Sequence, residues 1–384
     1  MGEYDSELSK IVAELNRAAP SQQRATAIHT PASTASLDQL LAFAVKSGAS
    51  DVLLVVGAAP VLRVYGVLTS TSRAPLEAEE VRNLVLPLLD DPQLEELHKR
   101  KSVDLSFMRE NLGRFRVNIH YQRGTLAASI RLLPSRIPSL ESLHLPPSLA
   151  KLADSRQGLV LVTGPTGCGK SSTLAALIDI INGKYQKHVV TIEDPVEYQH
   201  TNRKCIIEQI EVGRDTPDFA ITLRSLMRQT PDVILVGEMR DAETMATALT
   251  AAETGHLVLS TLHTNDAIQA TARILDSFPA TNQGQMRQQL SLALLAIIAQ
   301  QLVPGLDGVS RWPATEVMIA TDSVRALVRK GDDHQLRSQI SVGRSEGMMT
   351  MEQSLADLVR TNRISRDAAY AHGFRTDDLA RYLP

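Results

Sequence analysis

The sequence predicts an α/β fold preceded by a smaller α+β domain, and three observations lead to this prediction. Mostly apolar or β-branched residues at 159–163 run straight into a glycine-rich turn, which is followed by a helical pattern at 173–181. Two segments nearer the N-terminus, 114–121 and 126–132, alternate between apolar and polar residues, which predicts strands with one buried face. Three further apolar runs end in polar residues, as parallel strands of an open α/β sheet do: 189–192, 232–236 and 257–262.

The composition is typical of a soluble globular protein and excludes several other classes. The 384 residues suggest two or three domains at about 150 residues each. A net charge of −3 provides no general attraction to nucleic acid or anionic lipid. Cys168 and Cys205 form no CxxC pair, so neither a zinc site nor a disulfide framework is indicated. The chain has no signal peptide and no apolar run of about 18 residues, so we expect a cytoplasmic protein.

Changes in composition along the chain predict five regions. Residues 1–35 are small, polar and interrupted by proline, so we expect a weakly ordered extension there. The α+β domain is expected at 36–134, followed by a proline-rich linker at 135–147. The main α/β domain is expected at 148–279, and a mainly helical region at 280–384.

The α+β domain has a clear helix start and an arginine-rich end. Ser36 can cap a helix at 37–46, which is expected to stop at Gly48. The alternating strands place Arg116 and Arg131 on polar faces. Further strands are expected at 52–56 and 61–68, and helices at 75–89 and 92–100.

The glycine-rich turn after residue 163 has the spacing of a phosphate-binding loop. Its glycines allow successive backbone N–H groups to point inward at phosphate oxygens, and the helix start adds partial positive charge. Lys170 can reach the β- and γ-phosphates, and the Ser171 hydroxyl can bind Mg²⁺. The sequence therefore predicts ATP and Mg²⁺ as ligands. The residues expected to contact the nucleotide are Gly164, Pro165, Thr166, Gly167, Cys168, Gly169, Lys170, Ser171 and Ser172.

The polar residues at the strand ends should meet this loop, because ligands of open α/β sheets bind beyond the carboxyl ends of the strands. Glu238 follows an apolar strand and is the best candidate for activating water. Glu193 can orient that water or hold the metal's waters, and His263 can contact the γ-phosphate. For His256 and His263, a structural histidine is as good an interpretation as a catalytic one when each is read alone.

Negative charge develops on the γ-phosphate during hydrolysis, and the main domain shows no obvious arginine to balance it. Arg116 and Arg131 of the small domain could supply this charge across a domain or subunit boundary, as an arginine finger does. A solvated strand face or a generic phosphate-binding patch is the alternative. The low aromatic content of 4% argues against binding of single-stranded nucleic acid.

The chain resembles the secretion ATPase superfamily, and most closely its type IV pilus retraction ATPases of the PilT/PilU type. Five segments carry the resemblance: GRFRVNIHYQRG at 113–124, GPTGCGKSS at 164–172, VVTIEDPVEYQH at 189–200, LRSLMRQTPDVILVGEMRDAETM at 223–245 and TGHLVLSTLHTNDA at 254–267. The resemblance implies a PAS-like N-terminal domain, a RecA-like ATPase core, a homo-hexameric ring and a nucleotide between the two domains. It implies functional roles for Lys170, Ser171, Glu193, Glu238, His256 and His263, with Arg116, Arg123 and Arg131 reaching the nucleotide.

The resemblance also implies a motor that acts on a platform protein of the inner membrane to withdraw pilins. Departures from the pattern leave two alternatives open. Cys168 replaces the usual serine, Leu53 replaces a histidine, and residues 323–330 match only part of the motif linked to retraction. An accessory PilU-like partner of a sister ATPase is one alternative. A pilus-assembly or type II secretion ATPase is the other, disfavoured because the tetracysteine zinc module of those proteins is missing.

Overall fold

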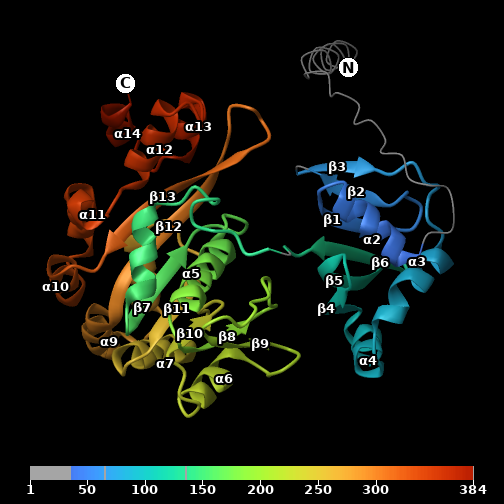
Figure 1. Ribbon diagram of the computed structural model, residues 1–384, viewed down its shortest axis with the longest axis horizontal. Helices are drawn as coiled ribbons and strands as arrows, with labels where there is room; N and C mark the ends of the chain where they lie inside the picture. Colours follow the sequence, from blue (N-terminus) through green and yellow to red (C-terminus); the bar gives the residue numbers. More distant parts are fainter. Residues whose placement is uncertain (1–35, 65, 135, 384) are drawn as a thin grey trace, which may run out of the picture. The chain divides into compact units, whose positions relative to one another are not determined.

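The computed structural model describes residues 36–64, 66–134 and 136–383, and the chain divides into two units between Leu133 and Pro134 (Figure 1). Each unit has its own sheet and its own core. The extension expected at 1–35 lies outside the described residues.

The first unit is a small α+β domain. Within residues 36–64 and 66–134, six antiparallel strands pair in the order β3-β2-β1-β6-β5-β4. The strands are β1 (Ala49–Leu54), β2 (Val61–Val64), β3 (Val67–Ser70), β4 (Ser102–Arg109), β5 (Gly113–Gln122) and β6 (Thr125–Leu132). The helices are α2 (Leu37–Lys46), α3 (Ala78–Val85) and α4 (Asp91–Arg100), and a 3₁₀ turn, η1 (Leu86–Leu88), follows α3.

The alternation in the sequence explains which face of this sheet is buried. Val117 and Ile119 of β5 and Ile130 of β6 are fully buried, and leucines of α2 pack in the same core. The helix expected at 37–46 is confirmed, and Ser36 forms a reciprocal capping box with Gln39. The strand expected at 61–68 is wrong in one respect, because it is the hairpin of β2 and β3.

The second unit is an α/β domain with a mostly parallel sheet. Across residues 136–383, seven strands lie in the order β13-β12-β7-β11-β10-β8-β9, and of these pairs β12–β13 is antiparallel. The strands are β7 (Gly158–Thr163), β8 (His188–Glu193), β9 (Ile206–Glu211), β10 (Val233–Val236), β11 (Leu257–Leu262), β12 (Leu294–Pro304) and β13 (Arg311–Ile319).

Helices cover both faces of this sheet. The helices are α5 (Lys170–Lys184), α6 (Phe219–Leu226), α7 (Ala242–Glu253), α8 (Ala267–Asp276), α9 (Ala280–Ala293), α10 (Asp322–Lys330), α11 (Leu336–Val342), α12 (Met351–Arg360), α13 (Arg366–His372) and α14 (Thr376–Tyr382). The 3₁₀ segments are η2 (Pro147–Asp154), η3 (Asp333–Gln335) and η4 (Gly343–Glu346). Leu177 of α5 packs with Val160 and Val162 of β7, whereas Leu249 of α7 packs with Leu159 and Leu161. Successive residues of β7 thus serve two cores, which is why this strand is apolar throughout.

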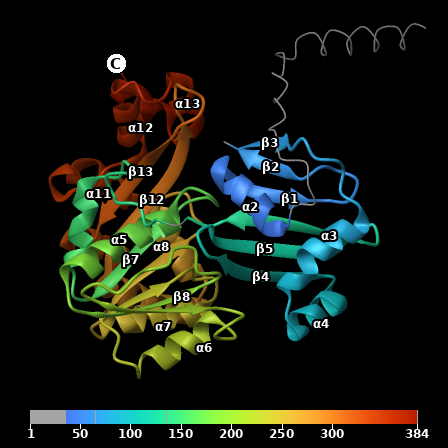
Figure 2. The ribbon, with the colours of Figure 1, turned by 45° about the vertical axis from the view of Figure 1, so that its right-hand side comes forward.

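The α/β fold class is confirmed, but two expected boundaries are wrong. The core does not end at residue 279, because β12 and β13 complete the sheet beyond that point. The region at 280–384 is therefore not simply helical, although α12 and α13 form a cluster beside β12 and β13 (Figure 2). The segment expected as a linker, 135–147, contributes Leu140 and Leu145 to the second unit's core. No helix in the described parts of the chain combines the length and apolar character needed to cross a bilayer.

Candidate nucleotide site

The phosphate loop lies at the carboxyl end of β7, where its glycines are required by both conformation and space. Gly164, Gly167 and Gly169 have φ values of 143°, 79° and 94°. A Cβ on Gly164 would lie 2.2 Å from the carbonyl oxygen of Gln300 in β12. A Cβ on Gly169 would lie 2.8 Å from the Gln300 Nε2 atom. The loop therefore packs directly against the neighbouring strand, and only glycine fits at these two positions.

Lys170 is the first residue of α5 and its ammonium group lies inside the loop. Its Nζ donates to the carbonyl oxygens of Gly164 at 2.8 Å and Pro165 at 3.1 Å. Burial lowers the pKa of Lys170, and the negative charges of Glu238 and Glu197 oppose that shift. The expected phosphate-binding lysine and the expected water-activating glutamate are therefore close enough to interact electrostatically.

The hydroxyls that follow Lys170 have different surroundings. Ser171 is the second residue of α5, where a hydroxyl beside the phosphate loop can act as one oxygen ligand of Mg²⁺. Ser172 forms a hydrogen bond of 2.7 Å with the Tyr198 hydroxyl, so its partner is the segment after β8. In the described part of the chain, no three His, Cys, Asp or Glu side chains cluster as a metal site.

Glu238 and His263 meet at the ends of adjacent parallel strands. Glu238 follows β10 and His263 follows β11, and the two strands pair through Val236 and Ser260. The Glu238 Oε2 atom lies 3.3 Å from the His263 Nε2 atom. Its Oε1 atom forms an ion pair with Arg240, which the sequence analysis did not propose as a site residue. The main domain therefore has an arginine near the expected site, but its guanidinium is paired with the Glu238 carboxylate.

Glu193 is the last residue of β8, and one of its carboxylate oxygens is held by two donors. Thr191 Oγ1 donates to Glu193 Oε1 at 2.7 Å, and Gln209 Nε2 donates to the same oxygen at 3.1 Å. Burial raises the pKa of Glu193, whereas these two hydrogen bonds lower it. Gln209 also donates to the Tyr198 carbonyl at 2.8 Å, which links Glu193 to the partner of Ser172. Gln209 lies on β9, and neither the strand nor this role was predicted.

Gln300 supports the phosphate loop from β12 and was also missed. Its side chain is 3% exposed. Its Nε2 donates to the Cys168 carbonyl at 2.7 Å, and its Oε1 accepts from Thr173 Oγ1 at 2.8 Å. Cys168 is itself buried, and burial raises the pKa of its thiol. The one available signal was a glutamine within an apolar run, which is unusual for a buried strand.

Within one copy of the chain, His256 does not lie with Glu238 and His263. It precedes β11, whereas His263 follows it, so the two histidines lie at opposite ends of the strand. The six residues between them span about 20 Å at 3.3 Å per residue. The His256 Nδ1 atom is 3.0 Å from the Ala251 carbonyl oxygen, a contact that suits a structural histidine.

The first unit has a row of charged side chains across its sheet. Arg116 and Arg131 are directly opposite each other on β5 and β6. Asp51 of β1 pairs with Arg131 Nε at 3.0 Å and with Arg63 Nε at 3.4 Å. Two arginines directly opposite each other repel, and the Asp51 carboxylate offsets part of this repulsion at Arg131. Arg123 lies in the β5–β6 turn, about 20 Å along the strand, and is separate from this pair.

Comparison with known sequences identifies the relatives of this chain. The type II/IV secretion system protein family matches residues 36–376. The type IV pilus retractation ATPase PilT of Pseudomonas aeruginosa is 43% identical over 333 residues, covering 87% of this chain and 96% of the relative. The type IV pilus ATPase PilU of the same organism is 41% identical over 342 residues, covering 89% and 90%.

A solved structure agrees with this assignment. The crystal structure of the pilus retraction motor PilT with bound ADP matches with a TM-score of 0.85 and 40% sequence identity. The match covers 90% of this chain and 99% of that one. The residues that form the phosphate loop and the strand ends here thus lie in a fold that binds a nucleotide in a relative. The chain belongs to the type II/IV secretion system protein family, as an ATPase of the PilT/PilU kind.

Proposed function

We propose that this protein is a hexameric motor that hydrolyses Mg²⁺-ATP to power type IV pilus retraction, from the cytoplasmic face of the inner membrane. One observation carries the proposal: Glu238 and His263 lie together at the end of the sheet where Lys170 also lies. Near-equal identity to a retraction motor and to PilU supports the pilus system as the setting.

The residues of the second unit divide the chemical work. Lys170 exchanges its two loop carbonyls for the β- and γ-phosphates. The Ser171 hydroxyl would hold Mg²⁺, which would neutralise part of the phosphate charge when bound. Glu238 accepts a proton from the attacking water through its carboxylate. Glu193 orients that water through its carboxylate, which Thr191 and Gln209 hold in place. His263 and Arg240 hold Glu238 and respond to loss of the γ-phosphate.

Arginines of the first unit complete the charge balance in this proposal. Arg116 and Arg131 reach the nucleotide across a domain or subunit boundary, with Arg123 as a further contact. Asp51 holds Arg131 in a fixed direction until a phosphate replaces the carboxylate. A homo-hexameric ring supplies such boundaries repeatedly.

The partners in this proposal are other copies of the chain, an inner-membrane platform protein and a sister retraction ATPase. Membrane association is peripheral and passes through the platform protein, and nucleic acid is not a partner. An accessory PilU-like role is the second candidate, because the identity to PilU, 41%, is nearly as high as the 43% identity to PilT. Turnover by the purified chain alone distinguishes the two roles, because an accessory ATPase hydrolyses little without its sister.

The catalytic assignment is tested by Glu238→Gln. Glutamine keeps the size and the hydrogen-bonding oxygen but cannot accept the proton, so turnover should fall by about a hundredfold or more with ATP affinity retained. Glu253→Gln, at the exposed end of α7, is the matched control and should leave turnover unchanged. Steady-state hydrolysis measures the turnover, and a nucleotide-binding assay measures the affinity for ATP. If the Glu238→Gln variant turned over ATP within twofold of the unmodified chain, Glu238 would not be the residue that activates water.

The cellular role is tested by gene deletion and electron microscopy of surface pili. More pili together with lost twitching is the expected result for a retraction motor. Normal pilus numbers would favour the accessory role, and fewer pili would favour an assembly ATPase.

A further inference from the structure

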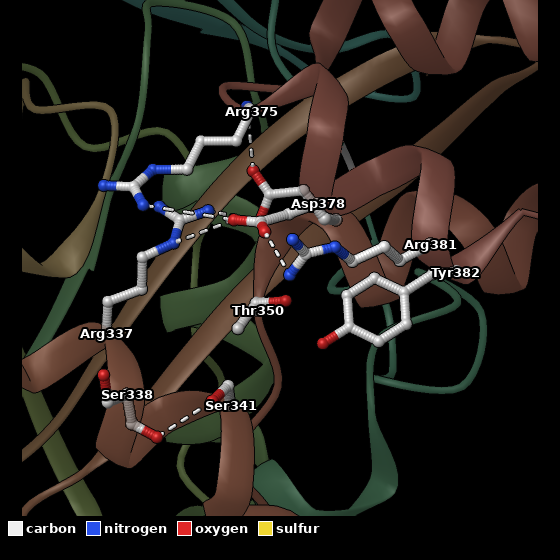
Figure 3. Close-up of a pocket in the computed structure, with 9 residues that line it drawn as sticks. Arg337, Ser338, Ser341, Thr350, Arg375, Asp378, Arg381 and Tyr382 are labelled. Carbon is white, nitrogen blue, oxygen red and sulfur yellow. Dashed lines mark hydrogen bonds and ion pairs between the residues drawn. The ribbon is translucent and has the colours of Figure 1, made fainter.

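A polar pocket lies among the C-terminal helices of the second unit, away from the phosphate loop. It has a volume of about 230 Å³ and is lined from α11, from the start of α12 and from α14. Figure 3 shows the side chains of Arg337, Arg375 and Arg381 directed toward Asp378. The other lining residues are Glu352, three hydroxyl side chains and a tyrosine. No residue of the nucleotide site contributes to this lining.

One ion pair forms the rigid base of the pocket. Arg337 Nη2 lies 2.6 Å from Glu352 Oε2, and the two side chains are 16% and 1% exposed. Glu352 Oε1 also accepts the backbone N–H of Arg375 at 3.2 Å. The negative charge of Glu352 is therefore fully used within the protein, and it fixes Arg337 in place.

The remaining charges are unevenly matched. Asp378 is shared by three guanidinium groups, with distances of 4.0 Å to Arg337, 4.0 Å to Arg375 and 3.6 Å to Arg381. These ion pairs are longer than a hydrogen bond, so Asp378 occupies the planar donors of Arg375 and Arg381 only loosely. With three cations and two carboxylates, the pocket has one excess positive charge.

We propose that this pocket binds a phosphate-bearing anion between Arg375 and Arg381. Arginine presents paired N–H donors that match the oxygens of a phosphate group, and two such forks meet here. Hydroxyl groups on α11 line the same space and can add neutral donors. The volume is below the range of about 300–1,000 Å³ found for drug-sized ligands, which fits a phosphate group rather than a whole nucleotide.

Inorganic phosphate is the probe for the test. The full chain is first saturated with Mg²⁺ and a non-hydrolysable ATP analogue, so that the phosphate loop is occupied. Phosphate binding is then followed by ³¹P line broadening. The double variant Arg375→Ala/Arg381→Ala should weaken binding by about tenfold or more, since charge-assisted hydrogen bonds are lost. Asp378→Asn should strengthen binding about threefold, because it removes a competing negative charge. Arg329→Ala, on the exposed side of α10, should change nothing.

Vesicle flotation distinguishes the two sources of such a phosphate. Flotation with phosphatidylglycerol vesicles but not phosphatidylcholine vesicles, lost in the double variant, identifies a lipid headgroup. Phosphate binding without flotation identifies a soluble phosphorylated molecule. The proposal is overturned if the unmodified chain binds no phosphate, or if the double variant binds it equally well. A folding defect could weaken phosphate binding by the double variant, but it could not produce the tighter binding that is expected of Asp378→Asn.

Discussion

Glu316 is a buried acid on β13, and replacing it should stabilise the protein at alkaline pH. The residue is 2% exposed, and its Oε1 atom accepts the backbone N–H of Ala267, the first residue of α8, at 3.0 Å. Burial raises the pKa of Glu316 from 4.5 to about 7. The carboxyl group therefore loses its proton within the physiological pH range, at a position shielded from solvent.

The size of the effect follows from this difference in pKa. The folded state binds the proton more tightly than the unfolded state, so stability is fully present below pH 4.5 and is lost as pH rises through about 7. At about 1.4 kcal/mol per pKa unit, the loss reaches about 3 kcal/mol at pH 8.5 and stays below about 1 kcal/mol at pH 5. Glu316→Gln removes the ionisation but keeps an oxygen for the Ala267 N–H. The variant should therefore be more stable than the parent at pH 8.5 and nearly equal to it at pH 5.

Urea unfolding followed by tryptophan fluorescence measures this difference. Trp312 is the one tryptophan in the sequence and lies on the same strand as Glu316, so its signal reports the second unit. Glu253→Gln, on the protein surface, serves as the control and should show no pH-dependent gain. A Glu316→Gln variant with the same stability as the parent at both pH values would refute the reasoning.

Three further predictions concern the nucleotide site. Gly164→Ala brings a methyl group within 2.2 Å of the Gln300 carbonyl oxygen, so nucleotide affinity should fall about tenfold or more, whereas Gly183→Ala in α5 should retain it. Gln300→Leu removes the side-chain partner of the Cys168 carbonyl, whereas the Thr173 hydroxyl keeps the Gly169 carbonyl as a partner, so nucleotide affinity and Tm should both fall and the free energy of unfolding should drop by about 1–3 kcal/mol. Gln301→Leu is its control, and equal effects of the two changes on nucleotide binding would contradict the role of Gln300. Because burial raises the pKa of Glu193, the acidic limb of the pH–rate profile should lie above the usual carboxyl range. Gln209→Leu removes a hydrogen bond that lowers this pKa, so the limb should move further up, and an unmoved limb would argue against Glu193 as the titrating group.

The parts of the fold with a clear local pattern were predictable from sequence. The alternation around Val117 predicted a half-buried strand, and the apolar runs before Glu238 and His263 predicted parallel strands whose ends converge. Their convergence needed no knowledge of side-chain packing, because neighbouring parallel strands end at one edge of the sheet.

The strand β12 was not predictable because its sequence resembles a continued helix. Helix α9 ends at Ala293 and β12 begins at Leu294, with no glycine or proline between them. A short apolar run of this kind does not distinguish a buried strand from a buried helix. The role of Gln300 depends on β12 lying beside β7, and its hydrogen-bond partners lie more than a hundred residues away, so it leaves no local signature. The role of Gln209 likewise depends on β9 pairing with β8.

The position of β12 affects how this protein can be recombined with its relatives. The strand pairs with β7 and carries the glutamine that supports the phosphate loop, although it lies about 130 residues further along the chain. A chimera joined at residue 280 would pair one protein's phosphate loop with another protein's supporting strand. A junction at residue 134 keeps the loop, β12 and α12 together, so working hybrids should tolerate exchange of the first unit far better than exchange of the C-terminal third.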